Sequence, residues 1–413
     1  MAEAKLFEAA LGVAAPWYGR DVAFDAQART LTIAVDFKSG TRFGVPAVPG
    51  EHPVHDTTVK RYRHLNFFQH ECVLEVRVPR VQLPDGSVRQ IEPSWAGKLA
   101  GFTQLFEALI LALCREMPFR AVARLTGVSL HRVMSLCARH VDLAVAQQAL
   151  SEVQALAIDE TSKARGHDYV TIAAEASRRA VIAVTEKRDA KAVERLAREI
   201  RAHGGDPDTV TSVSIDRSPS FIKGVACQFS NAQVTFDKFH GIAHASQALD
   251  LTRRAEQKRD PALKGMRWTL LKDSRHLNSV AREDLDTLMA DVTTKRTARA
   301  WGYREQLREI LNRKQVNVVR LMLQQWCTNV CRSKVLPMKA VARLVRSHID
   351  GICAWAQTRA TNGFLEALNG LFQAAKRKAR GYGRFSTIRT VIFLIAGKLD
   401  FSKINPHMAG LPT

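Results

Sequence analysis

The sequence predicts an α/β protein whose sheet-containing core is interrupted by a long all-helical segment. Three patterns support this prediction. Alternating apolar and polar residues with turn signals occupy the first 100 residues, apolar runs typical of buried strands begin at residue 153, and helical periodicity continues from about 238 to 355. The chain has 413 residues, enough for several domains.

Residues 1–100 are expected to form a small strand-containing module. Segments 31–35 and 73–77 alternate apolar and polar side chains, as half-buried strands do. Turn signals at 39–40 and 84–86 separate such segments.

Residues 101–150 are predicted to form a helix-turn-helix domain. After a broad apolar helix at 102–117, two shorter helices are expected at 119–125 and 130–140, joined by a turn that contains Gly127. An ordinary helical hairpin would show the same pattern, so the basic charge of the chain decides in favour of DNA binding. The polar side of the last helix carries His131, Arg132, Ser135 and Arg139, of which Arg132 and Arg139 are candidate DNA contacts.

Residues 151–258 are predicted to form the first part of the α/β core. Strands are expected at 153–158, 169–174, 180–185, 210–215 and 233–236, with a helix after the third, fourth and fifth. This order is the opening of a ribonuclease-H-like fold, in which the first and fourth strands lie side by side. Acids that follow these two strands should therefore meet beyond their carboxyl ends.

Residues 259–355 are predicted to be a helical insertion in this core, because amphipathic periodicity runs through them. Its aromatic residues are expected to pack in the interior rather than to stack on bases. Residues 356–400 should complete the core with a large helix that begins near residue 362, and 401–413 form a tail. The stretch 376–384 is densely basic.

The net charge of +21 indicates a polyanionic partner, since Lys and Arg that neutralise phosphates release condensed counterions. An unrelated basic enzyme or a membrane-surface protein would be the alternatives. The seven cysteines are scattered and odd in number, as in a chain with reduced thiols, and Cys327 with Cys331 is expected to be core packing rather than half a metal site. The N-terminus does not resemble a signal peptide, and the longest apolar stretch is too short to span a bilayer. A soluble, cytoplasmic, nucleoid-associated protein is expected.

Two aspartates follow the predicted first and fourth strands. Asp159 and Asp216 are 57 positions apart, which leaves room for three strands and a helix, and Glu366 lies 150 positions further on, beyond the insertion. Two-metal phosphoryl transfer needs carboxylate oxygens that bridge ions about 3.5–4 Å apart. Asp159 and Asp216 are therefore candidate catalytic ligands, although each could instead cap a loop or helix.

Asp237 is the competing acid, because it also follows a strand and begins an Asp-x-x-His segment that ends at His240. The fifth strand lies outside the fourth in this topology, so Asp237 should be farther from Asp159 than Asp216 is. We expect a supporting role for Asp237 and His240, in orienting a ligand or contacting DNA. Simple capping by Asp237 and a structural His240 remain the alternative.

The helix that carries Glu366 places further polar side chains on the same face. This stripe would run from the metal ions along a DNA backbone, and its candidate DNA contacts are Asn369, Lys376, Arg377 and Arg380. A solvated charged face is the usual alternative, but the helix already has an apolar side for burial.

Four ordered blocks resemble bacterial insertion-sequence transposases of the ISL-three family, and the resemblance covers essentially the whole chain. The blocks include Ile158-Asp-Glu-Thr-Ser-Lys163, Ile215-Asp-Arg-Ser-Pro-Ser-Phe221, Asn231-Ala-Gln-Val-Thr-Phe-Asp-Lys-Phe-His240 and Thr361-Asn-Gly-Phe-Leu-Glu366-Ala-Leu-Asn369. The resemblance implies a DDE transposase with Asp159, Asp216 and Glu366 as the metal-binding triad. It further implies that the substrates are the terminal inverted repeats of a mobile element.

The sequence departs from that family in its first module. The family commonly has a zinc-binding module with paired Cys or His ligands, and the corresponding places here read His52-Pro-Val-His55 and Leu83-Pro-Asp-Gly86. The second pair has neither thiol nor imidazole, whereas a structural zinc needs four such ligands. We therefore expect a degenerate zinc-ribbon-like DNA-binding module without structural zinc.

The function predicted from these features is metal-dependent cleavage and strand transfer of DNA. Two Mg²⁺ ions, with Mn²⁺ able to substitute, are the expected cofactors. The expected partners are double-stranded DNA, as terminal inverted repeats and as target, and further copies of the chain in at least a dimer on DNA, with no membrane partner. A structure-selective ribonuclease-H-like nuclease and a non-catalytic DNA-binding regulator derived from a transposase are the alternatives.

Overall fold

The computed structural model describes residues 8, 13–164, 168–216, 218–236, 238–290, 295–358 and 363–409, with backbone alone at 238–240, 274, 295 and 355–358. The chain forms two compact units. Unit 1 contains Met1–Gln148 and Phe372–Thr413, and unit 2 contains Ala149–Leu371. The predicted domains placed 356–400 together in the core, whereas the compact units divide the chain inside that segment.

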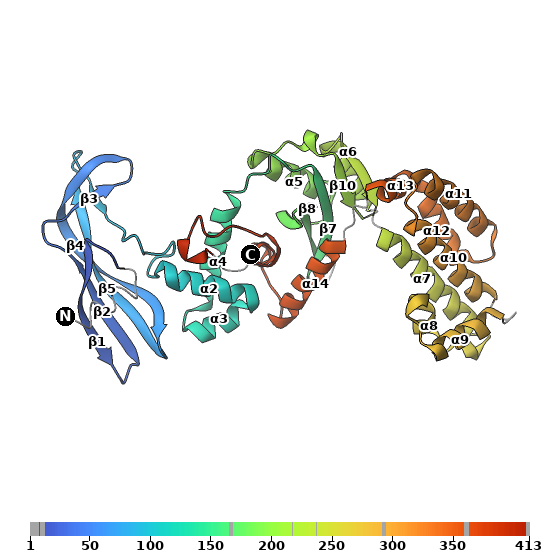
Figure 1. The fold of residues 1–413 in the computed structure, drawn as a ribbon, viewed down its shortest axis with the longest axis horizontal. Helices are drawn as coiled ribbons and strands as arrows, with labels where there is room; N and C mark the ends of the chain where they lie inside the picture. Colours follow the sequence, from blue (N-terminus) through green and yellow to red (C-terminus); the bar gives the residue numbers. More distant parts are fainter. Residues whose placement is uncertain are drawn as a thin grey trace. The chain divides into compact units, whose positions relative to one another are not determined.

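Unit 1 begins with a six-stranded sheet (Figure 1), which confirms the predicted strand-containing module. Its order is β1-β2-β5-β4-β3, with β6 paired to β5, and only the β2–β5 pair is parallel. The strands are β1 (Trp17–Asp25), β2 (Thr30–Phe37), β3 (Arg42–Val45), β4 (Val48–Phe67), β5 (His70–Gln82) and β6 (Val88–Gln90).

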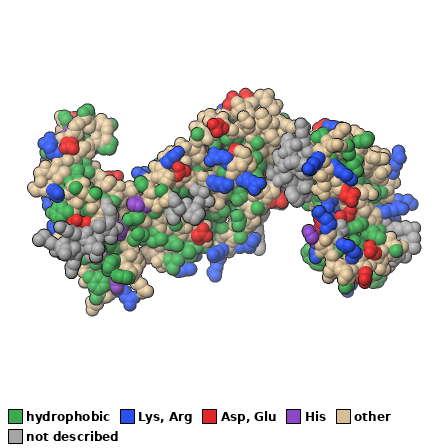
Figure 2. Space-filling model, in the orientation of Figure 1, with side chains coloured by type: hydrophobic (Ala, Val, Ile, Leu, Met, Phe, Trp, Pro, Cys, Tyr) green, Lys and Arg blue, Asp and Glu red, His purple; other side chains and the backbone are tan. Residues whose placement is uncertain are grey.

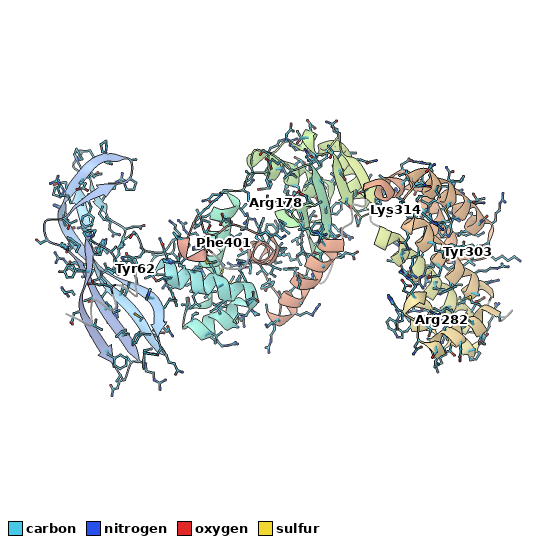
Figure 3. The ribbon with its side chains drawn as sticks, viewed as in Figure 1. Tyr62, Arg178, Arg282, Tyr303, Lys314 and Phe401 are labelled. Atoms are coloured by element: carbon cyan, nitrogen blue, oxygen red, sulfur yellow. The ribbon has the colours of Figure 1, made fainter. Side chains whose placement is uncertain are left out.

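One face of this sheet is covered by its own apolar core. Alternate residues of β2, namely Leu31, Ile33 and Val35, are buried, as expected of a strand with one solvated face. Edge-to-face aromatic contacts extend the core, since Trp95 lies 6.4 Å from Trp17 between ring centroids. Tyr62, labelled in Figure 3, packs on the same Trp95 ring at 5.2 Å.

The predicted helix-turn-helix is present. It follows α2 (Gln104–Glu116) and consists of α3 (Phe119–Thr126) and α4 (Leu130–Val145). The turn between them uses Gly127 in the left-handed region at φ +68°, where glycine has no Cβ penalty. Ser129 caps α4, because its hydroxyl accepts the amide of Arg132.

The C-terminal residues of the chain pack on these helices. α15 (Phe385–Ala396) contacts α2 and α4, and Arg389 forms a 2.6 Å ion pair with Asp142 of α4. Asn405 donates a hydrogen bond of 2.7 Å to the backbone oxygen of Gln104. This packing explains why residues 372–413 belong to unit 1.

Unit 2 contains a five-stranded sheet in the order β11-β10-β7-β8-β9. β7 pairs antiparallel with β8 and parallel with β10, so the first and fourth strands of the unit are neighbours, as predicted. The strands and their intervening helices are β7 (Ala155–Ala164), β8 (Asp168–Glu175), β9 (Ala180–Glu186), α5 (Ala190–Ala202), β10 (Ser212–Ile215), α6 (Pro219–Gln228) and β11 (Gln233–Phe236).

The predicted all-helical segment follows β11 (Figure 1), and Figure 3 labels Tyr303 within it. Its helices are α7 (Lys238–Gln257), α8 (Arg267–Leu271), α9 (Ser279–Ala290), α10 (Lys295–Asn312), α11 (Val316–Arg332), α12 (Leu336–Ser347) and α13 (Ile349–Thr358). α13 returns to the sheet, where a Cβ on Gly351 would lie 2.3 Å from the Phe236 ring. Glycine is therefore required where α13 crosses β11, and α14 (Gly363–Lys378) follows.

The helices and the surface charges of the structure bear on the expected partners of the chain. Within the described ranges, no helix is both long and apolar enough to cross a membrane. Figure 2 shows Lys and Arg side chains distributed over the visible face of both units, in keeping with the net charge of +21.

Candidate active site

Two aspartates of unit 2 come together through the register of neighbouring parallel strands. Ser212 pairs with Ala155 and Ser214 pairs with Ala157, a constant offset of 57 residues. Continued by two residues, this register brings Asp216 level with Asp159, because they differ by the same 57 positions. Neighbouring strands lie about 4.8 Å apart. The sheet therefore places the two predicted carboxylates side by side at one edge.

The surroundings of Asp159 and Asp216 differ. Asp159 is only 8% exposed, and its Oδ1 accepts the amide of Glu160 at 2.8 Å. Asp216 is half-buried and follows the last residue of β10, and its Oδ1 accepts the amide of Ser218 at 2.9 Å. This turn begins α6, so Asp216 also shapes the loop, as the capping alternative supposed.

Asn369 of α14 bonds directly to β7. Its Nδ2 donates to Asp159 Oδ2 at 2.8 Å and to the backbone oxygen of Glu160 at 3.3 Å. The carbonyl oxygen can only accept, so the nitrogen of the amide must face β7 and the oxygen must face away. The Asn369 Oδ1 atom is buried and has no hydrogen-bond partner among the described residues.

Glu366 lies one helical turn before Asn369, in the first turn of α14, and its side chain is exposed. Because residues three apart share a helix face, the bond from Asn369 to β7 brings Glu366 towards the part of β7 that carries Asp159. Sequence analysis placed Asn369 on this face as a DNA contact. The structure shows that its amide is bound to Asp159.

The electrostatics of Asp159 reflect the neighbouring acids. Burial, which has the largest effect, and the negative charges of Glu160, Asp216 and Glu366 together raise the pKa of Asp159 to about 7, against the opposing effect of the Glu160 amide. Asp159 forms no ion pair with any described Lys, Arg or His. A buried carboxyl among like charges is the usual signature of a functional site.

The donor set fits a hard divalent cation in its chemistry. Asp159, Asp216 and Glu366 supply carboxylate oxygens, and the unsatisfied amide oxygen of Asn369 adds a fourth oxygen of the type that Mg²⁺ accepts. In the part of the chain that the structure describes, no three His, Cys, Asp or Glu side chains are close enough to hold one ion. Further convergence of the carboxylates would therefore accompany metal binding.

A cavity of about 520 Å³ opens beside Asp216 and extends to the helical segment, since its lining includes Leu344 of α12. Glu160 and Arg188 border it and form an ion pair of 3.4 Å, and the Arg188 guanidinium also stacks over Tyr169 at 4.2 Å. Sequence analysis missed Glu160, Arg188 and the exposed His244 of α7 as residues of this cavity.

A sequence signal existed for one of these residues. His244 lies four positions after His240, and residues four apart share a helix face. The supporting role predicted for Asp237 and His240 stays a prediction, because Asp237 and the side chain of His240 lie outside the described residues.

The two predicted DNA contacts of α4, Arg132 and Arg139, differ in their surroundings. The Arg132 guanidinium donates to the backbone oxygen of Ala100 at 2.5 Å and stacks over Phe102 at 3.9 Å. It therefore attaches α4 to the loop before α2. Arg139 is exposed. His131 and Ser135 line a cavity of about 150 Å³ together with residues of the C-terminal segment, including Arg384.

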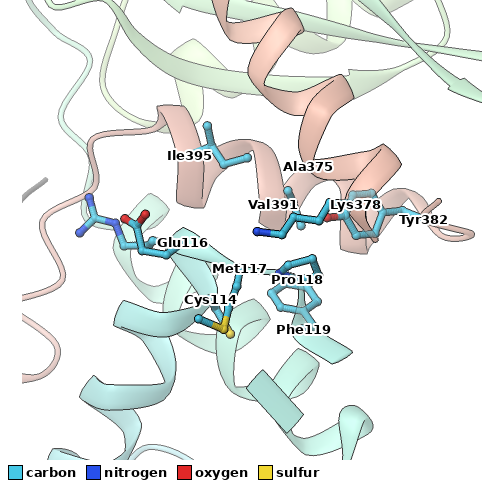
Figure 4. Close-up of a pocket in the computed structure, with 11 residues that line it drawn as sticks. Cys114, Glu116, Met117, Pro118, Phe119, Ala375, Lys378, Tyr382, Val391 and Ile395 are labelled. Carbon is cyan, nitrogen blue, oxygen red and sulfur yellow. The ribbon is translucent and has the colours of Figure 1, made fainter. Parts of the chain in front are cut away.

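The basic stretch at the end of α14 packs on the helix-turn-helix of unit 1. Figure 4 shows a cavity in which Cys114 and Phe119 lie opposite Lys378 and Tyr382. The Tyr382 ring stacks on Phe372 at 6.3 Å, and burial raises its pKa. Residues of the basic stretch and of the first helix of the helix-turn-helix therefore line one cavity, and the Tyr382–Phe372 stacking lies within the C-terminal segment.

The predicted cations of this stretch are placed differently from one another. Lys376 is half-buried, and burial lowers its pKa, whereas Arg377 and Arg380 are exposed. Arg380 has a φ of +61° and ends the helix, with the amide of Gly381 bonded to the oxygen of Lys376. A left-handed position that glycine would favour therefore carries an arginine.

Comparisons with known proteins agree with these features. A family model described as Transposase, for DDE transposases of the ISL3 (ISL-three) group, matches residues 156–392, and one described as the helix-turn-helix domain of transposase family ISL3 matches 91–141. The transposase of insertion sequence element IS1001 from Bordetella parapertussis is 24% identical over 338 residues, which cover 80% of this chain and 82% of the relative. The transposase of IS1557 from Mycobacterium tuberculosis is 23% identical over 362 residues and 78% of each chain. Because the first model covers more than half of the sequence, the chain belongs to the ISL3 family of transposases.

Proposed function

We propose that this chain binds the terminal inverted repeats of an insertion sequence and cuts and rejoins DNA with a ribonuclease-H-like catalytic core. The observation that carries the proposal is the 57-residue register, which places Asp216 level with Asp159. The strand order β11-β10-β7-β8-β9, with only the β7–β10 and β10–β11 pairs parallel, supports the fold assignment.

Asp159, Asp216 and Glu366 are the proposed holders of two Mg²⁺ ions, for which Mn²⁺ could substitute. The ions supply Lewis acidity toward the scissile phosphate and the attacking oxygen. Asp159 and Asp216 are attached to adjacent strands, so their spacing is fixed by the sheet. Glu366 comes from a helix, and its position depends on how α14 docks on β7.

Asn369 is the proposed positioning residue for that docking. Its two bonds to β7 connect a residue beyond the helical segment to the strand that carries Asp159, across 210 positions of sequence. The bond to Oδ2 also fixes the orientation of the Asp159 carboxylate. Asn369 would thus keep α14 on β7, so that Glu366 needs only a limited further approach to the aspartates when an ion binds.

The remaining groups of the cavity are proposed to bind the DNA strand. Arg188 lies at its border with its guanidinium half exposed, where it could contact a phosphate, and the ion pair with Glu160 holds it there. In the first step water hydrolyses the phosphodiester at the 3′ end of the element. In the second, the freed 3′-hydroxyl displaces a strand of the target in line, and at least two copies of the chain would pair the two ends.

Glu366→Gln tests the catalytic assignment. The variant should bind end DNA as the wild type does and lose Mg²⁺-dependent cleavage, because the amide cannot supply an anionic ligand. Asp350→Asn is the matched control, since Asp350 is an exposed acid of the helical segment that pairs with Arg320. Undiminished cleavage by the Glu366 variant would exclude the assignment, and equal binding of repeat and random DNA would favour a structure-selective nuclease.

Asn369→Leu tests the positioning role with a measurement that does not depend on activity. Isothermal titration with Mn²⁺ alone should show a loss of affinity of roughly tenfold or more, as is typical when a residue that orients metal ligands is removed. Asn369→Asp should weaken binding of Mn²⁺ less, because it replaces the lost bond by a fourth anionic oxygen. Equal Mn²⁺ affinity in the wild type and the leucine variant would show that Asn369 is not a positioning residue.

A further inference from the structure

The turn between β4 and β5 presents aromatic rings to solvent. Phe67 and His70 form the last pair of the hairpin, so Phe68 and Gln69 make a two-residue turn. Phe68 is 84% exposed and Phe67 is 40% exposed, and their rings meet edge to face at 4.7 Å. We call Phe67 and Phe68 the aromatic tip. Two adjacent phenyl rings at the end of a polar hairpin are not explained by the fold of the sheet.

The backbone at the tip is one that its sequence does not favour. Phe68 has a φ of +51°, and a bulky residue in the left-handed region is a strained choice at a turn position where glycine is preferred. Strain of this kind persists where the surrounding structure enforces it, and it often marks a functional position. Here its consequence is that the Phe68 ring projects from the hairpin.

The hairpin is attached firmly to the helix-turn-helix. The backbone of Arg63 in β4 exchanges hydrogen bonds with the loop before α2, receiving one from Thr103 and donating one to Gly101. Nδ1 of the neighbouring His64 forms a 2.8 Å hydrogen bond with the Thr103 hydroxyl, which also caps α2. The tip end of the hairpin is therefore joined to the start of the helical domain by backbone and side-chain hydrogen bonds.

The tip end of the hairpin lies beside the turn of the helix-turn-helix. A Cβ on Gly127 would be 2.8 Å from Oε1 of Glu71, the residue after His70. Gly127 precedes α4, and in helix-turn-helix proteins the N-terminal residues of the second helix approach the base edges. The tip thus occupies the flank of the surface expected to meet DNA.

The charges around the tip suit a polyanion. Arg63 lies 3.5 Å from Glu71 and neutralises it, and donates a 2.6 Å hydrogen bond to Asn66 at the end of β4. Arg29, in the turn between β1 and β2, is exposed, and its backbone oxygen accepts the amide of Glu71. Arg29 therefore leaves an exposed cation in the turn next to the tip, whereas the Arg63 side chain is only 12% exposed and is paired. Proteins that insert apolar side chains into duplex DNA also carry cations beside them.

We propose that the aromatic tip is a wing that inserts Phe68, supported by Phe67, into the minor groove of duplex DNA beside the segment read by α4. Partial unstacking of one base step by the ring would bend the duplex toward the helix-turn-helix. This inference goes beyond the catalytic proposal and rests on the binding of duplex DNA by this domain. It commits to DNA as the occupant because the tip is continuous with the helix-turn-helix surface.

Phe68→Gly is the decisive variant, because it removes the ring and relieves the strained φ, so folding should be preserved or improved. The probe is duplex DNA selected from a random library by the full-length chain, with 2-aminopurine at successive positions. The wild type should enhance fluorescence at one step outside the α4 site, and the variant should lose this enhancement. Its affinity should fall roughly tenfold, the scale of one lost base–aromatic contact.

Val59→Ala is the matched control, since Val59 is an equally apolar, 63% exposed residue on the same strand away from the tip. It should leave both signals unchanged, and Phe68→Trp should restore them. Unchanged fluorescence and affinity in Phe68→Gly would overturn the wing. A lower mass of the Phe68→Gly protein than of the wild type, measured without DNA, would also overturn the wing, because the tip would then be a contact between copies of the chain. Failure of the wild-type chain to select any duplex would instead refute the DNA-binding premise, which separates the two outcomes.

Discussion

Two buried aspartates, one in each unit of this transposase, have opposite electrostatic surroundings. In unit 1 Asp36, buried on β2, pairs with Arg77 at 3.2 Å and Arg20 at 3.8 Å. In unit 2 Asp159, similarly buried, accepts the backbone amide of Glu160 and the side-chain amide of Asn369, and the charges nearest to it are those of other acids.

A second buried acid of unit 1, Glu107, resembles Asp36. Glu107 of α2 accepts the amides of Lys98 and Leu99 and lies 3.3 Å from His140 of α4, with both side chains fully buried. A buried acid with partners fastens structural elements together, whereas a buried acid among acids stores repulsion that a cation can relieve. The difference separates the structural carboxylates from the proposed catalytic ones.

The largest effect expected from this comparison is on Asp159→Asn. DNA cleavage in Mg²⁺ should fall by at least about a thousandfold, the scale of several kcal/mol in the barrier. The free energy of unfolding should stay the same or rise, because the substitution removes repulsion and no ion pair. End-cleavage assays and thermal melting measure the two quantities, and a destabilised variant would show that Asp159 is a fastener like Asp36.

Glu107→Ala should have the opposite signature. Removing one partner of a buried pair costs about 3–5 kcal/mol, and here two backbone amides also lose their acceptor. Hydrogen exchange of α2 in the full chain should report this loss of stability, while the Mn²⁺ affinity of unit 2 stays unchanged. Glu116→Ala, an exposed acid at the end of the same helix, is the control and should change stability by less than about 0.5 kcal/mol.

The buried His64 makes the stability of unit 1 depend on pH. Burial first, and then the nearby charges of Arg63 and His407, lower its pKa from 6.5 to about 4, so the unfolded state binds the proton more tightly. Stability contributed by neutral His64 is therefore present above pH 6.5 and is lost as the pH falls towards 4, by about 3 kcal/mol in all. Hydrogen exchange of β4 between these pH values measures the loss. His64→Gln should flatten this dependence, and an equal slope in that variant would assign the effect to another group.

The smallest effect concerns Arg380, where unit 1 keeps an exposed cation in a left-handed conformation. Arg380→Gly should stabilise the end of α14 by about 1 kcal/mol, because glycine adopts this φ without strain. The same variant should weaken DNA binding and lower its salt dependence by about one phosphate contact. Unchanged DNA affinity would remove Arg380 from the proposed DNA-binding surface.

Much of the core could be predicted because its strands contain apolar runs, although β7 continues past the predicted end at residue 158 and places Asp159 inside the strand. The predicted segment 233–236 coincides with β11, and 180–185 lies within β9, whose first six residues are all buried. The spacing of Asp159 and Asp216 was visible in the sequence, and it equals the register of β7 with β10. The local sequence pattern and the parallel pairing of β7 with β10 therefore both bring Asp159 and Asp216 together.

The long hairpin of unit 1 was much harder to predict. β4 runs from Val48 to Phe67, yet its solvent face is charged and it contains proline and glycine, so its alternation is weak. Only 73–77, the most apolar part of β5, was recognised as a strand there. The aromatic tip was missed for a different reason. Its rings are apolar, and only the tertiary structure shows that they are exposed.

The sequence by itself determined the family, the helix-turn-helix, the strand order of the core and its candidate carboxylates, because these depend on local periodicity and on short motifs. Only the tertiary structure decided that Asn369 bonds to Asp159 and that residues 372–413 pack with the N-terminal unit. Both arrangements join segments separated by more than 200 residues. Contacts at such separation depend on how whole elements pack, and no local pattern records them.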